Sequence, residues 1–340
     1  MVGTRINSGH DNPAGDRSRR PVPRFLDAET VAELSRVRPG RALGRIAVEW
    51  LLIATAIVVT IRVSWWLYPL AVVVIGSRIH SLLILMHEGA HRRLIGHQVA
   101  NDTISELFLA FPVFVTLRGY RVTHFAHHRH INEPADPDLA FKANRADEWM
   151  FPKTTGGLVR LLLPELLGVR AHRLVMEMVD VADGDESTRP PRWFVAGRVV
   201  FYAVGAAVLT MLGWWVGFVL FWMVPVLTWL AFTLRLRSVQ EHFGLELAGP
   251  LTMSRSTTPT VFDRIFLAPA NVSYHLDHHL YPSVPYYRVP ELHRRLMGVP
   301  GFAEHAHLTE GFVGVLRELT GRGDSSVANA PLLEQASRAR

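Results

Sequence analysis

Three short runs of histidine contain the residues most able to do chemistry. His87 and His91 stand four apart in HEGAH, so on a helix both imidazoles would point from one face. The runs HFAHH and HLDHH place histidines at i, i+3 and i+4, and EHFG holds one more. Imidazole nitrogens bind zinc, copper, iron and nickel in proteins. The candidate metal ligands are therefore nine residues: His87, His91, His124, His127, His128, His242, His275, His278 and His279.

The number of these histidines indicates two metal ions. A tetrahedral zinc takes four ligands, or three ligands and a water, so nine nitrogens are too many for one such ion. They suit two ions of five or six coordination, each with a position left open. The sequence therefore predicts a histidine-rich di-metal site.

HEGAH also allows two other classes of metal protein. It fits the HExxH signature of zinc metalloproteases, with Glu88 as the general base. A membrane zinc hydrolase is therefore an alternative, although it needs only one further ligand and leaves six histidines unexplained. A metal transporter is another, and it is disfavoured because the apolar segments hold almost no histidine or acid besides His80 and Glu49.

Acidic residues adjoin every histidine run. Ligating histidines commonly donate their second ring N–H to a carboxylate, which fixes the orientation of the ring. The alternative is a solvated or helix-capping carboxylate. The candidates for this supporting role are Glu88, Asp136, Asp138, Glu241 and Asp277.

The composition places these residues in a membrane protein. Of 340 residues, 49% are hydrophobic and 19% charged, against about 25% charged in soluble domains. No charged residue lies between Val199 and Leu234. Since one crossing of the hydrocarbon core needs about 20 helical residues, this stretch is long enough for two spans.

A second long apolar stretch begins at Ile46, and tryptophans typical of the membrane interface mark the middle of each stretch. We predict spans at about 46–62, 64–86, 194–213 and 216–236. Shorter apolar segments at 107–117 and 158–169 are expected to be interfacial or re-entrant helices. The expected fold is an all-α integral membrane protein, with four transmembrane helices in two hairpins and a cytoplasmic helical cap that holds the di-metal site.

The arginines predict the orientation. Nine of them precede the first span, and arginine is abundant after the second and fourth spans. By the positive-inside rule, both termini and all nine histidines should face the cytoplasm, and we expect a multi-pass protein of a bacterial cytoplasmic membrane. We divide the chain into a polar segment at 1–45, a membrane domain at 46–310 and a C-terminal tail at 311–340.

Two compositional features exclude other functions. The chain has no cysteine, which rules out disulfides, thiolate metal sites and cysteine nucleophiles. Its net charge of +6 is a modest excess without a basic block interleaved with aromatic residues, so no nucleic-acid partner is expected.

The histidine runs resemble the three histidine boxes of the membrane fatty acid desaturase superfamily, which includes alkane hydroxylases and carotenoid-modifying enzymes. The resemblance covers residues 46–296 and includes the DPD at 136–138, the EHFG at 241–244 and the NVSYHLDHHLYPSVPYY run at 271–287. The last two motifs are most similar to a bacterial branch that holds dihydrorhizobitoxine desaturase. Some relatives place an asparagine one turn before the fourth-helix ligand. Here that residue is Ser238, and we do not assign this tenth contact to Asn271.

This resemblance implies a non-haem di-iron centre with O2 as co-substrate and the nine histidines as iron ligands. The expected activity is introduction of a double bond into an acyl-lipid or lipid-like substrate. Desaturation of a small amino-acid-like metabolite is the alternative, as is hydroxylation or ketolation by the same chemistry. Electrons are expected from a separate donor, a ferredoxin or similar carrier with its reductase.

Overall fold

The computed structural model describes residues 24–143, 145–183, 190–245 and 249–322 of the chain. Within this part, four helical segments are long and apolar enough to cross a membrane. The first span is α2 (Pro39–Arg62), and the second, Trp65–Ala90, joins the short helix η1 (Trp65–Leu67) to α3 (Tyr68–Ala90). The third is α10 (Arg192–Met211). The fourth, Trp215–His242, consists of α11 (Trp215–Phe218), the π-helical segments η5 (Val219–Met223) and η6 (Val226–Leu230), and α12 (Ala231–His242).

The four predicted spans are confirmed, and the helices extend beyond the predicted limits on the histidine side. The first helix begins seven residues earlier than expected, and the second and fourth end four and six residues later. A helix rises 1.5 Å per residue, so these extra turns project beyond a hydrocarbon core of about 30 Å. As a result, His87 and His242 lie on the same continuous helices as the second and fourth spans.

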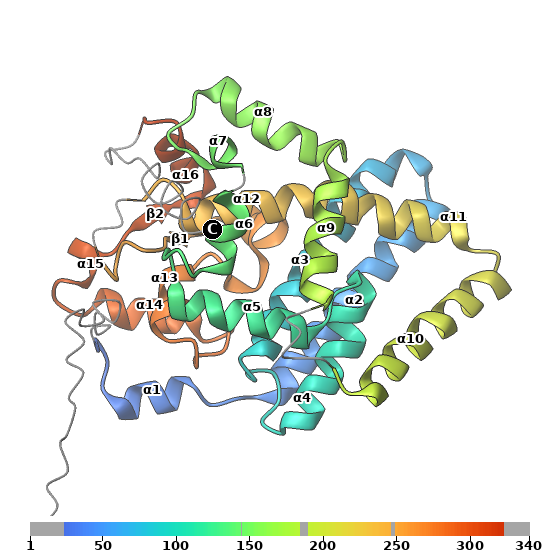
Figure 1. The fold of residues 1–340 in the computed structure, drawn as a ribbon, viewed down its shortest axis with the longest axis horizontal. Helices are drawn as coiled ribbons and strands as arrows, with labels where there is room; N and C mark the ends of the chain where they lie inside the picture. The colour runs from blue at the N-terminus through green and yellow to red at the C-terminus, as the bar shows by residue number, and fades with distance from the viewer. Residues whose placement is uncertain (1–23, 144, 184–189, 246–248, 323–340) are drawn as a thin grey trace, which may run out of the picture.

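The remaining elements form a cap at the end of the spans where α3 and α12 finish (Figure 1). Its helices before the third span are α4 (Gln98–Ser105), η2 (Glu106–Ala110), η3 (Phe111–Val113), α5 (Leu117–His130), α6 (Pro137–Ala143), α7 (Ala146–Trp149), α8 (Thr155–Leu166) and α9 (Ala171–Asp183). After the fourth span come β1 (Ser256–Thr258), η7 (Asp263–Leu267), η8 (Pro269–Asn271), α13 (His275–Leu280), α14 (Val289–Met297), α15 (Phe302–His305), β2 (Leu308–Glu310) and α16 (Gly311–Leu319). The two strands pair in parallel. The short helix α1 (Ala28–Leu34) precedes the first span.

Both short apolar segments are helical, as expected. The residues from Gln98 to Val113 and those of α5 form a pair bent by 93°, which together could be a broken span or a re-entrant loop. The second segment corresponds to α8, which continues through Pro164 and ends two residues later.

Helix α3 is the centre of the membrane domain, and every residue from Ile75 to Ala90 except the partly buried Leu83 is buried. Two glycines allow close packing along it. A Cβ at Gly76 would meet the Trp229 side chain of η6 at 2.8 Å, and one at Gly89, inside HEGAH, would collide with Ser105 of α4. Because interiors are close-packed, Gly89 fixes how near α4 comes to the first histidine run, and Gly76 fixes how near η6 comes to α3 three turns earlier.

Glu49 lies in the first span and is fully buried, but its charge is compensated. Its carboxylate accepts hydrogen bonds from Arg45, from Arg78 at 3.2 Å and from the Ser81 hydroxyl at 2.6 Å. Ionisable residues inside a membrane are retained when they pair with one another. Glu49 therefore joins α2 to α3, which gives it a structural role and removes one of the two residues that a transport pathway would have used.

The predicted C-terminal tail begins with an ordered element. Helix α16 packs Val315 and Leu319 against Val239 and Phe243, at the end of the fourth span. Residues 1–23 of the predicted N-terminal segment and 323–340 of the tail lie outside the described residues.

Candidate metal centre

Four elements bring the nine candidate histidines to one place. His87 lies in the last turn of α3 and His91 caps its C-terminal end, His242 is the last residue of α12, and α5 and α13 supply three each. In each hairpin the second helix runs back to the side from which the first one started. The C-terminal ends of the second and fourth spans, at Ala90 and His242, therefore lie on the same side, next to the cap. The ring nitrogens form two groups, and within each group one nitrogen per residue lies within 4.8 Å of all the others.

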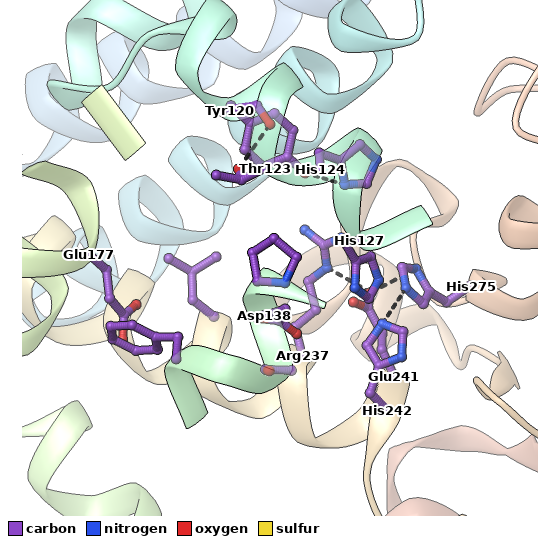
Figure 2. Close-up of a pocket in the computed structure, with 14 residues that line it drawn as sticks. Tyr120, Thr123, His124, His127, Asp138, Glu177, Arg237, Glu241, His242 and His275 are labelled. Atoms are coloured by element: carbon purple, nitrogen blue, oxygen red, sulfur yellow. Dashed lines mark hydrogen bonds and ion pairs between the residues drawn. The ribbon is translucent and has the colours of Figure 1, made fainter. Parts of the chain in front are cut away.

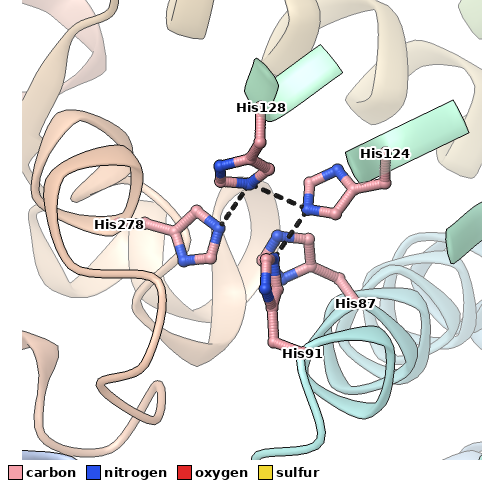
Figure 3. Close-up of side chains that lie close together, drawn as sticks. All are labelled: His87, His91, His124, His128 and His278. Carbon is pink, nitrogen blue, oxygen red and sulfur yellow. Dashed lines mark hydrogen bonds between the residues drawn. The ribbon is translucent and has the colours of Figure 1, made fainter. Parts of the chain in front are cut away.

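The first group consists of His87, His91, His124, His128 and His278 (Figure 3). The Nε2 atom of His124 lies 2.8 Å from that of His91 and 3.0 Å from that of His128. The His128 Nε2 is in turn 3.1 Å from the His278 Nε2. One Nε2 atom carries either a single proton or a single lone pair, so this chain of contacts is not satisfied by ordinary hydrogen bonds.

The second group consists of His127, His242, His275 and His279. The His275 Nε2 lies 2.9 Å from the Nε2 atoms of both His242 and His279. The same valence argument applies, because one His275 nitrogen faces two other Nε2 atoms. The two groups adjoin each other, with the rings of His128 and His279 centred 4.3 Å apart.

The spacing of the nitrogens fits metal coordination. Metal–nitrogen bonds of about 2.1 Å, with neighbouring ligands about 90° apart, separate the nitrogens by about 3.0 Å. The observed Nε2 separations are 2.8 to 3.1 Å. The donor set is all imidazole, which suits iron, zinc, copper or nickel. Five nitrogens in one group and four in the other could hold two ions.

The histidines of α13 are held in the form that binds metal. Burial, followed by the repulsion of neighbouring histidines, lowers the pKa of His275, His278 and His279 well below the ordinary value. Only a neutral imidazole offers a lone pair to a metal. These three side chains are therefore ready to act as ligands at neutral pH.

Three of the five predicted supporting acids lie next to a candidate ligand. Both Asp136 oxygens are 3.0 Å from Nδ1 of His127. A Glu88 oxygen lies 3.5 Å from the His87 Nδ1, and a Glu241 oxygen lies 3.4 Å from the His275 Nδ1. Each of these contacts is on the nitrogen opposite Nε2, which leaves Nε2 free for a metal.

The other two predicted acids have different partners in the part of the chain that the structure describes. Asp277 accepts a hydrogen bond from Ser256 and lies 3.0 Å from Nδ1 of His293, so it ties α13 to β1 and α14. Asp138 forms an ion pair with Lys142, one turn later on α6. Their expected contact with a ligand ring is not observed.

A cavity of about 420 Å³ opens against the histidines (Figure 2). Its wall includes His124, His127, His242 and His275, and Ser238 stands one turn before His242 on the same wall. Asn271, by contrast, donates a hydrogen bond to the Tyr286 carbonyl. A second cavity of about 310 Å³ adjoins this one and has no histidine among the described residues of its wall. We call the cavity beside the histidines the inner cavity and the second one the outer cavity. The two share seven lining residues: Tyr120, Asp138, Phe141, Glu177, Leu234, Arg237 and Ser238.

Comparison with known proteins identifies the family. The family model for fatty acid desaturases matches residues 64–310, which contain all nine histidines. The chain belongs to this family.

Its relatives are desaturases of diverse substrates. The chain is 29% identical to dihydrorhizobitoxine desaturase of Bradyrhizobium elkanii over 304 residues, or 85% of each protein. It is 28% identical to the sn-1 oleoyl-lipid 12-desaturase of Anabaena variabilis, over 49% of this chain and 48% of that one. It is 25% identical to a sphingolipid delta(4)-desaturase/C4-monooxygenase of Homo sapiens, over 89% of this chain and 83% of that one. This desaturase-family chain is therefore an oxidoreductase.

The structure adds residues to the candidate site that the sequence analysis missed. The Tyr120 ring stacks on that of His124, with centroids 5.0 Å apart, and Arg237 donates a 2.6 Å hydrogen bond to Glu241. Each of these two residues stands four positions before its partner, on the same helix as that partner. This spacing places the two members of a pair on one helix face, so both residues were predictable from the sequence. Glu177 of α9 also lines the cavity, and nothing in its local sequence indicates this.

Proposed function

We propose that this protein is an O2-dependent di-iron desaturase that receives electrons from a separate carrier, a ferredoxin or similar protein with its reductase. The observation that carries the proposal is the convergence of nine histidine nitrogens into two groups beside a cavity, in a chain of the desaturase family. Bound iron would supply the activation of O2 and the removal of hydrogen from an unactivated C–H bond. Overall, one O2, two electrons and two protons convert a CH2–CH2 unit into an alkene and two waters.

The protein's own residues hold and orient this chemistry. The nine imidazoles present ring nitrogens from four elements, and Asp136, Glu88 and Glu241 lie beside Nδ1 of three of them. Such carboxylates fix the tautomer and the ring orientation. The inner cavity would hold a substrate carbon against the second group, because His127, His242 and His275 line it.

Two substrate classes compete for this site. An acyl lipid is the expectation from the breadth of the family, and a small amino-acid-like metabolite is the alternative. The largely apolar groove that would suit a lipid chain, of about 580 Å³, is lined by residues of α2, η2 and α10 such as Trp50, Phe108 and Phe201, and it shares no lining residue with the cavity beside the histidines. This separation favours the small metabolite.

The test of the reaction is product analysis with isotopically labelled oxygen. Membranes containing the protein, given ¹⁸O2, a reduced ferredoxin and its reductase, should yield a lipid or a soluble metabolite that has lost two hydrogens and carries no ¹⁸O. Retention of one ¹⁸O per product would show hydroxylation instead. Hydrolysis without O2 consumption would favour the zinc hydrolase.

We expect replacement of Asp136 by asparagine to weaken iron binding about 10- to 100-fold, the usual effect of losing a carboxylate behind a ligating histidine. The reason is that Asp136 lies 3.0 Å from the His127 Nδ1 and also accepts hydrogen bonds from the backbone N–H groups of Asn132 and Asp138. The measurement is iron affinity by competition with a chelator. Glu133→Gln on the same loop is the control, because among the described residues the Glu133 side chain pairs with the half-exposed His130 and with no candidate ligand. Equal affinities in the two variants would contradict the role given to Asp136.

We also propose that the histidine side of the protein faces the cytoplasm of a bacterial cell. In this cysteine-free chain, Val63→Cys in the first hairpin turn and Ala303→Cys in the cap introduce single exposed thiols. A membrane-impermeant maleimide should label the first in intact spheroplasts and the second only after lysis. Labelling of position 303 in intact spheroplasts would show the opposite orientation.

A further inference from the structure

Charged side chains of both signs line the outer cavity, and most of them pair with one another. Arg173 lies 2.8 Å from Glu148, which also binds Arg235, and Arg235 lies 3.9 Å from Glu165. The remaining pairs are formed by Lys142 with Asp138 and by Arg237 with Glu241. These residues therefore neutralise each other without a ligand.

Two side chains of the same cavity are exceptions. Glu177 of α9 and Arg145, which precedes α7, make no side-chain hydrogen bond or ion pair with any residue in the described ranges. One is an acid and the other a base, and both line the outer cavity. Figure 2 shows Glu177 across the inner cavity from His127, His242 and His275. The two adjoining cavities together thus have a histidine end, in the inner cavity, and an end with two charges available to a ligand, in the outer cavity.

An unpaired carboxylate in this position has an energetic cost. Burial of a charge is unfavourable unless the charge is paired, and here burial raises the pKa of Glu177 to about 7. An ammonium group placed beside Glu177 would relieve this cost through a charge-assisted hydrogen bond. Arg145 offers the guanidinium fork that suits a carboxylate.

Apolar side chains form part of the walls between the two ends. Phe141 and Leu234 line both cavities, and Leu83, Leu174 and Met178 line the outer one. Small-molecule sites combine such apolar walls with a few polar groups that fix orientation, in volumes of about 300 to 1,000 Å³. The two cavities, of about 420 and 310 Å³, fall in this range.

We propose that the outer cavity binds the charged end of a small aliphatic amino acid, with Glu177 accepting hydrogen bonds from its ammonium group and Arg145 donating to its carboxylate. The aliphatic part then runs past Leu234 to the histidines. This inference rests on the proposed function only for the reaction that follows binding. It makes Glu177 and Arg145 specificity residues of the substrate site.

Binding of three six-carbon probes to the full-length, iron-loaded protein in lipid nanodiscs tests the proposal. Calorimetric titration should give the tightest binding for L-norleucine, which carries both charges, and weaker binding for hexylamine and hexanoate. Glu177→Gln should weaken the binding of norleucine and of hexylamine about 10-fold or more and leave the affinity for hexanoate unchanged. Arg145→Gln should weaken the binding of norleucine and of hexanoate and leave the affinity for hexylamine unchanged. Glu133→Gln, outside both cavities, should change none of the three.

The opposite patterns of the two variants separate a specific role from damage to the fold. A variant that misfolds loses the binding of all three probes alike. Selective loss of binding in either variant therefore supports the role assigned to that residue. Absence of saturable norleucine binding, or loss of all three probes alike in both variants, would overturn the proposal. Because binding needs neither O2 nor an electron donor, failure of desaturation would leave this result standing.

Discussion

Replacing His127 or His278 by alanine is expected to abolish turnover, with a loss of more than about 100-fold, while the protein remains in the membrane. Each substitution removes one imidazole from a different group of ring nitrogens, and loss even of a supporting residue typically costs about 10- to 100-fold. The measurement is turnover per mole of protein recovered from the membrane fraction, together with its iron content.

His130→Ala is the matched control. His130 lies on the same helix and in the same HHRH run, but its ring is half-exposed, pairs with Glu133 at 3.1 Å and belongs to neither group. The control should retain turnover and iron. Wild-type turnover in His127→Ala or in His278→Ala would show that the nitrogen concerned is not an essential ligand.

Arg255→Met is expected to lower the free energy of unfolding by about 3–5 kcal/mol, the usual cost of breaking a buried ion pair. Arg255 is fully buried, lies 2.8 Å from Glu318 of α16, and donates hydrogen bonds to the Gln240, Phe243 and Gly244 carbonyls at the end of the fourth span. Methionine has a similar volume and no donor, so these acceptors would lose their partner.

The same substitution should also disturb the metal centre, because two of the carbonyls that accept hydrogen bonds from Arg255 belong to Gln240 and Phe243, on either side of His242. We therefore expect Arg255→Met to lose iron as well as stability. The measurement is a denaturant titration in detergent, with Arg294→Met on the exposed side of α14 as control. If both variants unfolded at the same denaturant concentration, Arg255 would not carry the packing of α16 on the fourth span.

The spans and the histidine site were predictable because both depend on short-range patterns. Apolar stretches of span length and histidines at i, i+3 and i+4 are visible without any tertiary information. The division of the histidines into two groups follows a rule within each HxxHH run. The outer pair, such as His124 with His128 or His275 with His279, enters one group, and the middle histidine enters the other.

The supporting acids were predictable only in part. Asp277 stands two residues after His275, and residues at i and i+2 on a helix do not share a face, which explains why its partners are Ser256 and His293. Asp138 instead forms an ion pair with Lys142, one turn later on the same helix. Glu177 reaches the cavity through the packing of α9 against α5, which no local pattern encodes.

The iron content of the purified protein tests the two-ion site most directly. Elemental analysis of protein prepared without chelators should find about two iron ions per chain, one for each group of histidines. His278→Ala and His127→Ala should each reduce this number, and His130→Ala should not. One zinc ion per chain, or a histidine site that binds no metal at all, would contradict the assignment of the nine histidines to a di-iron centre.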